Sequence, residues 1–191
     1  MVYRLIKRLG DVVLSAAGLI VLSPVFLFII LAVKTDGKGP VLFKQKRIGR
    51  KKKQFTMLKF RTMKTDSPKE TPTHLLENPG KYTTKIGKFL RKTSLDELPQ
   101  IFNIIAGHMS IVGPRPALWN QYDLIEERDK YGANDIRPGL TGWAQINGRD
   151  ELGISVKAEF DGEYVRRMGF LFDCRCFMTT VGKVFKGDGI K

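Results

Sequence analysis

Cysteine and histidine are scarce in this sequence, with two residues of each type among 191. Cys174 and Cys176 are separated by one residue, which is too close for an ordinary disulfide. With only His74 and His108 to join them, they do not supply the ligand set of a zinc site. A disulfide scaffold and a zinc centre are therefore excluded, and reduced thiols facing the cytosol are expected.

Acidic residues are also few, with 19 Asp and Glu against 33 Lys and Arg, a net charge of +14 and a pI near 9.9. Such an excess predicts attraction to polyanions: nucleic acid, anionic lipid headgroups or phosphorylated metabolites. No familiar nucleic-acid-binding signature is present, so nucleic acid is not an expected partner. The length favours a single domain over 1–191, without internal repeats.

A stretch without any charge covers 12–33 and is rich in Val, Leu, Ile, Phe and Ala. At about 1.5 Å per helical residue it is long enough to cross a hydrocarbon core of about 30 Å. It lacks a convincing small-residue cleavage site and is longer than the apolar part of most signal peptides. We therefore expect a membrane segment that stays in the mature protein.

Ser23 and Pro24 lie in the middle of this stretch, and a proline there predicts a kink or break, since it removes a backbone donor. The Ser23 hydroxyl is a candidate partner for a freed carbonyl. Both flanks are basic, with Arg4, Lys7, Arg8 before the stretch and Lys34, Lys38, Lys44, Lys46, Arg47, Arg50, Lys51, Lys52, Lys53 after it. Lys/Arg-rich flanks favour the cytoplasm, so a re-entrant helix-break-helix over 12–33 satisfies both, with a kinked span as the alternative.

The remainder, 39–191, is expected to form a cytosolic and interfacial catalytic part. Short apolar runs at 41–43 and 55–60 predict a small β-hairpin with its turn near 48–53. Helical patterns cover 86–90, 95–105 and 118–130, and apolar residues spaced by four from Val156 continue a helical pattern towards 185. The last helices suit either a core or the membrane interface. The segments 66–82 and 136–143 contain several prolines and glycines and are predicted to be loops. The fold class is thus α+β and mainly helical.

Two adjacent acids, Asp96 and Glu97, stand out in the octapeptide 93–100 of an otherwise basic chain. Ser94 and Glu97 have the spacing of a helix capping box, and taken alone the octapeptide favours that structural interpretation. A carboxylate pair surrounded by cations is also what chemistry on a phosphorylated substrate requires. The two interpretations are compatible if Ser94 caps a helix whose first turn presents Asp96.

Five ordered motifs resemble those of the bacterial sugar transferase family, the small monotopic phosphoglycosyl transferases. They are the hydrophobic hairpin, Lys59-Phe60-Arg61-Thr62-Met63, Ser94-Leu95-Asp96-Glu97-Leu98-Pro99-Gln100, Gly113-Pro114-Arg115-Pro116 and Arg137-Pro138-Gly139-Leu140-Thr141-Gly142. The resemblance covers nearly the whole chain and corresponds to the minimal catalytic unit of the family. It implies that Asp96 is the nucleophile and that Glu97 assists with Mg²⁺, so both are candidate metal ligands.

The implied reaction transfers a sugar 1-phosphate from a nucleoside diphosphate sugar to polyprenol (undecaprenyl) phosphate. Uridine is the commoner donor base in the resembling family, and the product begins a surface polysaccharide or glycoconjugate. The implied location is the cytoplasmic face of the bacterial inner membrane, with membrane lipid as a further partner. The sequence leaves the sugar, the glycan pathway and the oligomeric state open, a homo-oligomer included.

The residue chemistry agrees, since a carboxylate can attack a phosphoryl group and divide one displacement into two. Cations must then neutralise the diphosphate. The candidates are Lys59, Arg61, Arg91, Arg115, Arg137 and Arg149. Lys59 and Arg61 would share one strand face, and the prolines beside Arg115 would restrict its backbone.

Two alternatives remain open. In the first, the lipid phosphate attacks directly and the two acids only hold Mg²⁺. In the second, the protein is a non-catalytic, membrane-anchored basic scaffold that binds polyanions. The scaffold accounts for the charge and the anchor but leaves the clustered acids and the arginine-bearing proline turns unexplained.

Overall fold

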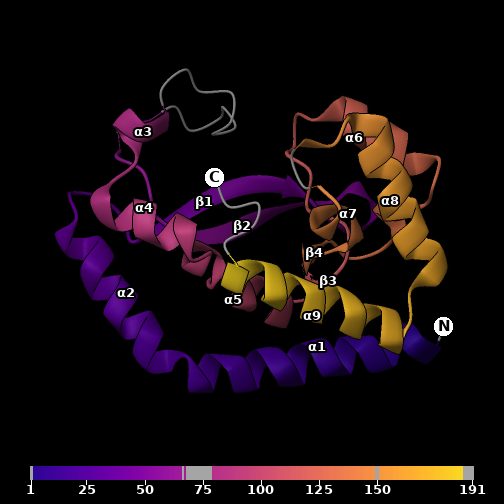
Figure 1. Ribbon diagram of the computed structural model, residues 1–191, viewed down its shortest axis with the longest axis horizontal. Helices are drawn as coiled ribbons and strands as arrows, with labels where there is room; N and C mark the ends of the chain where they lie inside the picture. The colour runs from indigo at the N-terminus through magenta and orange to yellow at the C-terminus, as the bar shows by residue number, and fades with distance from the viewer. Residues whose placement is uncertain (1, 66, 68–78, 149–150, 187–191) are drawn as a thin grey trace.

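The computed structural model describes residues 2–65, 67, 79–148 and 151–186 (Figure 1). Most of the predicted loop 66–82 and the candidate Arg149 lie outside this part. The described elements, in chain order, are α1 Val2–Val21, α2 Ser23–Thr35, β1 Leu42–Ile48, η1 Arg50–Lys52, β2 Gln54–Phe60, α3 Pro79–Tyr82, α4 Lys85–Lys92, η3 Leu95–Glu97, α5 Gln100–Ile105, β3 Ser110–Val112, α6 Tyr122–Asp129, η4 Ala133–Asp135, β4 Gly139–Thr141, α7 Trp143–Ile146, α8 Ile154–Arg167 and α9 Phe170–Lys186. The predicted α+β, mainly helical class is confirmed.

The predicted break at Ser23 and Pro24 is present as a bend of 64° between α1 and α2. Pro24 has no N–H to donate to the carbonyl of Ile20, and the Ser23 hydroxyl donates to that oxygen instead, at 2.8 Å. In the described residues no single helix is long and apolar enough to cross a membrane, whereas the bent pair together meets both criteria. The bend is compatible with a re-entrant pair and with a broken span.

α1 is amphipathic and begins ten residues before the uncharged stretch, so it includes the basic flank. Its exposed apolar side chains include Val2, Leu5, Ile6, Leu9 and Val13, which share one face. The opposite face carries Asp11, which is buried and accepts hydrogen bonds from Ser110 Oγ (2.7 Å) and the Ile111 N–H (3.1 Å). α1 therefore lies with its polar face on the catalytic part and its apolar face uncovered.

The predicted hairpin is formed by β1 and β2, antiparallel and with Phe43 opposite Lys59. At its tip Lys51 and Lys52 have left-handed backbones, with φ of 55° and 58°. Asn103 of α5 binds the edge of β2, because its Oδ1 accepts from the Leu58 N–H (3.0 Å) and its Nδ2 donates to the Thr56 carbonyl (2.8 Å). The hairpin and the helix that follows the Asp96 turn are thereby joined next to Lys59.

A second sheet pairs β3 with β4 in parallel, so the prediction of a loop over 136–143 was wrong for its central residues. The backbones approach very closely here. A Cβ on Gly139 would lie 2.1 Å from the Gly113 nitrogen, and one on Gly142 would lie 2.0 Å from the Gly113 oxygen. Only glycine allows this contact, which fixes the start of the turn that carries Arg115.

The C-terminal helices complete the core. The buried ion pair of Arg128 and Asp161 joins α6 to α8, with 2.6 Å between Nη2 and Oδ2. α9 runs alongside α1 (Figure 1) and carries Asp173. The Asp173 carboxylate accepts hydrogen bonds from Tyr3 (2.6 Å) and Lys7 (2.6 Å) of α1 and from Tyr164 (2.7 Å) of α8.

The substitution Gly139→Ala is expected to lower the melting temperature (Tm), because the new methyl group has backbone atoms within 2.3 Å. Overpacking costs about 1–3 kcal/mol, and about 1 kcal/mol moves Tm by roughly 2–4 °C in a domain of this size. Thermal unfolding of the detergent-purified protein measures the change. Gly182→Ala is the control, since no heavy atom lies within 4 Å of its added Cβ. Equal Tm values for the two variants would contradict the close approach.

Candidate functional site

Asp96 lies in the 3₁₀ turn η3, between α4 and α5. Ser94 precedes it with a left-handed backbone (φ 56°, ψ 14°), and its side chain makes no capping hydrogen bond. The predicted capping box and the continuous helix over 95–105 are therefore wrong. The chain reverses at Ser94, forms a short turn and enters α5 only after Pro99.

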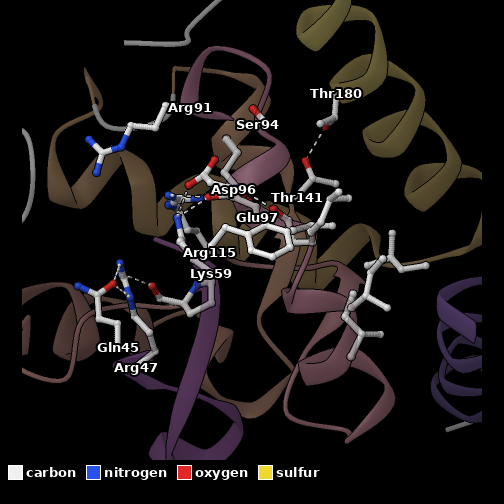
Figure 2. A pocket seen from close by; sticks show the side chains of 18 of the residues that line it. Gln45, Arg47, Lys59, Arg91, Ser94, Asp96, Glu97, Arg115, Thr141 and Thr180 are labelled. Carbon is white, nitrogen blue, oxygen red and sulfur yellow. Dashed lines mark hydrogen bonds and ion pairs between the residues drawn. The ribbon is translucent and has the colours of Figure 1, made fainter. Parts of the chain in front are cut away.

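Three cationic side chains approach this turn from different elements. Lys59 Nζ of β2 lies 2.7 Å from Glu97 Oε1 and 4.0 Å from Asp96 Oδ2. Arg115 Nη2 lies 3.6 Å from the same Glu97 oxygen. Figure 2 shows Lys59 and Arg115 side by side below the two acids, with Arg91 on the other side. The structure thus brings together five of the predicted site residues.

Asp96 is 8% exposed. Burial raises the pKa of its carboxyl group, and the negative charge of Glu97 adds to the rise, whereas Lys59 in particular, with Arg91 and Arg115, opposes it. The net effect is upward, so the charge on Asp96 is costly unless further positive charge arrives. Within the described part of the chain its carboxylate accepts no hydrogen bond.

Arg91 is held in place by a close helix contact. A Cβ on Gly87 would lie 2.1 Å from the Thr62 oxygen, so glycine lets α4 sit directly on Thr62. One turn later the Nε of Arg91 donates to Thr62 Oγ1 at 2.9 Å. Burial lowers the pKa of Arg91 and the charge of Asp96 raises it. Its terminal nitrogens point away from Glu97 in Figure 2.

The turn that carries Arg115 is braced by Arg47, a residue to which the sequence analysis gave no site role. Arg47 donates through Nη1 to the Pro116 carbonyl (2.9 Å) and through Nε and Nη2 to Gln45 Oε1 (3.1 and 2.7 Å). Gln45 and Arg47 are two residues apart on β1 and so share a strand face. The spacing of Gln45 and Arg47 could have indicated that they act together. The contact of Arg47 with Pro116 could not be predicted, because Pro116 lies 69 residues further along the chain.

The structure does not bring Arg61 or Arg137 to this cluster. Arg61 is buried and donates to the carbonyls of Val33 (2.8 Å), Gly37 (2.7 Å) and Lys38 (2.8 Å), so it caps the end of α2. Arg137 donates to the Gly107 carbonyl beyond α5 (2.9 Å).

A cavity of about 2290 Å³ contains the site. The cluster residues Lys59, Arg91, Asp96, Glu97 and Arg115 line its polar part. Its other walls include Leu14 of α1 and Phe177 of α9. The cavity therefore connects the acidic pair with apolar side chains of α1 and α9.

Residues 2–187 match the family described as bacterial sugar transferase. The chain belongs to this family. The family assignment from the motifs is thus confirmed, and the site just described is the candidate active site of a family member.

Among curated relatives, the chain is 44% identical over 192 residues to UDP-glucose:undecaprenyl-phosphate glucose-1-phosphate transferase of Escherichia coli (strain K12), covering 96% of this chain and 41% of that protein. It is 40% identical over 187 residues to the uncharacterized sugar transferase EpsL of Bacillus subtilis, covering 98% and 91%. It is 36% identical over 197 residues to the exopolysaccharide production protein ExoY of Sinorhizobium fredii, covering 96% and 87%. The chain spans about two-fifths of the first protein and most of the other two.

The donor set near Asp96 fits Mg²⁺ better than a metal that needs a complete protein cage. In the residues that the structure describes, no group of three or more His, Cys, Asp or Glu side chains is placed to hold a metal. Mg²⁺ commonly binds through one or two carboxylates together with water and substrate phosphates. Asp96 and Glu97 supply this number of carboxylates.

Asp96→Asn is expected to raise Tm at pH 7. Because the folded-state pKa of Asp96 lies above its ordinary value, the folded protein holds this proton more tightly, and stability falls as pH rises through the interval between the two values. Asparagine removes that loss, so the Tm difference should shrink as pH falls towards 4. Glu126→Gln neutralises an exposed acid as a control. A lower Tm for Asp96→Asn at pH 7 would contradict the upward shift.

Proposed function

We propose that this protein is a phosphoglycosyl transferase that moves a sugar 1-phosphate from a nucleoside diphosphate sugar to a polyprenol phosphate at a membrane surface. The observation that carries the proposal is a buried carboxylate, Asp96, among Lys59, Arg91 and Arg115 in a cavity that reaches α1 and α9. The name of the Escherichia coli relative supports a uridine diphosphate donor and undecaprenyl phosphate as acceptor.

In the first step, an oxygen of Asp96 forms a bond to the sugar-linked phosphorus of the donor. The bond from that phosphorus to the bridging oxygen breaks, and the nucleoside monophosphate leaves with the electron pair. Lys59 and Arg115 approach the acids from one side and Arg91 from the other, so positive charge surrounds the position of the diphosphate. Such preorganised charge stabilises the transition state of phosphoryl transfer.

In the second step, an oxygen of the lipid phosphate attacks the phosphorus held by Asp96, and the bond to the Asp96 oxygen breaks. The carboxylate is thereby restored and the sugar is joined to the lipid through a diphosphate. The apolar wall from Leu14 and Phe177 suits a hydrocarbon chain that arrives from the membrane. Beside the cavity, α9 is joined to β4 by a hydrogen bond between the hydroxyl groups of Thr180 and Thr141, whose oxygens are 2.5 Å apart.

Asp96 and Glu97 would hold Mg²⁺ with the donor diphosphate. When bound, the ion neutralises charge on the diphosphate and on the departing phosphate. The protein residues have separate tasks: Lys59 holds Glu97 in position, and Arg115 is aimed by a turn that Arg47 braces.

The bent helix pair is the proposed membrane anchor, re-entering from the cytoplasmic face of the bacterial inner membrane. Basic residues flank it on both sides, which favours a cytoplasmic location for both flanks. The uncovered apolar side chains of α1 and of α9, Phe170 and Leu171 among them, suit contact with lipid. The name of the ExoY relative supports a role in surface polysaccharide synthesis.

The proposal predicts that Asp96→Asn abolishes release of nucleoside monophosphate when no lipid acceptor is present, by a factor on the order of 10³ or more, as expected for loss of a nucleophile. A panel of nucleotide sugars, each labelled in the sugar, is incubated with the protein and Mg²⁺. The wild-type protein should retain label covalently on the peptide that contains Asp96. Donor cleavage that requires the lipid, with no labelled peptide, would instead support direct attack by the acceptor.

Arg115→Gln is expected to lower kcat/KM for the donor by about 10- to 100-fold. A hydrogen bond to a charged group contributes about 1.5–3 kcal/mol, and about 1.4 kcal/mol corresponds to tenfold. Arg166→Gln, an exposed charge on α8, is the matched control. Equal kcat/KM values for the two variants would remove Arg115 from the proposed site.

A further inference from the structure

A second group of arginines lies where α1 meets the end of α5, away from the Asp96 cluster. Arg8 donates to the carbonyls of Ile104 (2.6 Å) and Ile105 (2.9 Å), the last residues of α5. Arg137 donates to the carbonyl of Gly107 (2.9 Å). A Cβ on Gly107 would lie 3.3 Å from Nη2 of Arg8, so the two guanidinium groups share the carboxyl end of one helix.

Arg50, at the tip of the hairpin, approaches the same place. Its Nε donates to the Asp135 carbonyl at 3.1 Å, two residues before Arg137. Burial lowers the pKa of Arg137, and the charges of Arg8 and Arg50 lower it further, while Asp11 opposes this. The charges of Arg8 and Arg50 are therefore close enough to Arg137 to disfavour its charged form.

The neighbouring acid Asp11 forms no ion pair with these arginines. Asp11 is already bound to Ser110 and the Ile111 N–H. No carboxylate of the described residues lies within 4.0 Å of the guanidinium groups of Arg8, Arg50 and Arg137. Each of the three donates to backbone carbonyls, which holds it in place without cancelling its charge.

One member of the group, Arg8, lies on α1 next to its exposed apolar side chains. Leu5 and Leu9, one turn and one residue from Arg8, are 69% and 67% exposed. Arg4 is also exposed and lies one turn before Arg8, on the same side of the helix. Cations at the border of an uncovered apolar helix face meet lipid phosphates when that face enters a bilayer.

We propose that Arg8, Arg50 and Arg137 form a binding site for the headgroup phosphate of an anionic phospholipid. Arginine forks bind phosphate through paired hydrogen bonds. The exposed lysines at the hairpin tip, Lys51 and Lys52 among them, add longer-range attraction. Because Arg137 does not line the Asp96 cavity, this site is separate from that of the polyprenol substrate. The inference rests on the membrane location in the proposed function, not on its chemistry.

Bound lipid would fix the catalytic part at a defined height above the membrane. α5 follows directly on the turn that carries Asp96, and Arg8 and Arg137 hold its other end. A phosphate between these arginines would therefore tie the end of α5 to the headgroup layer.

The test compares the protein in nanodiscs of phosphatidylcholine alone and with 30% phosphatidylglycerol. A ligand that binds only the folded state raises Tm, so phosphatidylglycerol should raise the Tm of the wild-type protein. Arg137→Gln and Arg50→Gln should each lose at least half of that increment, and Arg166→Gln should retain it. High salt should weaken the increment, because it screens exposed charges. This readout uses neither donor nor acceptor, so it can fail while the transferase proposal holds.

Arg137→Gln also removes the hydrogen bond to the Gly107 carbonyl, which lowers Tm in every lipid. This loss does not affect the test, because the increase in Tm with phosphatidylglycerol is measured against the same variant in phosphatidylcholine. If this variant does not fold, the exposed Arg50 decides the outcome. An increment that is absent in the wild-type protein, or unchanged in both variants, overturns the proposal. Glycerol phosphate and polyprenol phosphate are tested in the same way. If either raises Tm as much as phosphatidylglycerol does, and both variants lose that increase equally, the ligand is not specifically a phospholipid.

Discussion

The polar face of α1 is bound to the catalytic part by two buried carboxylates, Asp11 and Asp173, and much of the site's placement depends on them. Asp173 of α9 accepts from Tyr3 and Lys7 of α1, and Asp11 of α1 accepts from the start of β3. A buried charge is tolerated only when it is paired and hydrogen-bonded, so removing one partner would leave a costly unpaired group. These contacts set how far Asp96 stands from the apolar face of α1.

The excess of basic residues is divided between support and chemistry. Arg61 and Arg8 cap the carboxyl ends of α2 and α5, where cations also complement the helix dipole. Arg47 braces a turn. The positive charges of Lys59, Arg91 and Arg115 instead act on Asp96 and lower its pKa against the effect of burial. A net charge therefore predicts a polyanion as partner, but it does not predict which cations meet it, because backbone carbonyls compete for the same guanidinium groups.

Local features could be predicted from the sequence, and long-range ones could not. The break at Pro24 follows from covalent geometry, and the hairpin from alternating runs around a short turn. The capping function of Arg61 depends on carbonyls more than twenty residues away, and the pairing of β3 with β4 joins segments of three residues each. Pro99 has no N–H to donate to the Leu95 carbonyl, so the predicted helix over 95–105 is interrupted, and Ser94 has a left-handed backbone instead of a helix cap. The motifs pointed to Asp96 and Glu97 as candidates. Only the fold showed that Arg115 lies at this cluster and that Arg137 lies elsewhere.

The 3₁₀ turn also explains how two adjacent acids have different environments. With about three residues per turn, neighbouring side chains point about 120° apart, so Asp96 and Glu97 diverge. Glu97 lies 2.7 Å from Lys59 and takes up its charge, whereas Asp96 stays 4.0 Å away. A tight ion pair to Asp96 would stabilise its carboxylate and occupy one of its oxygens. Lys59 is instead near enough to oppose the upward pKa shift of Asp96, while its ion pair is made with Glu97. In the proposed reaction, this arrangement leaves an Asp96 oxygen available to the donor.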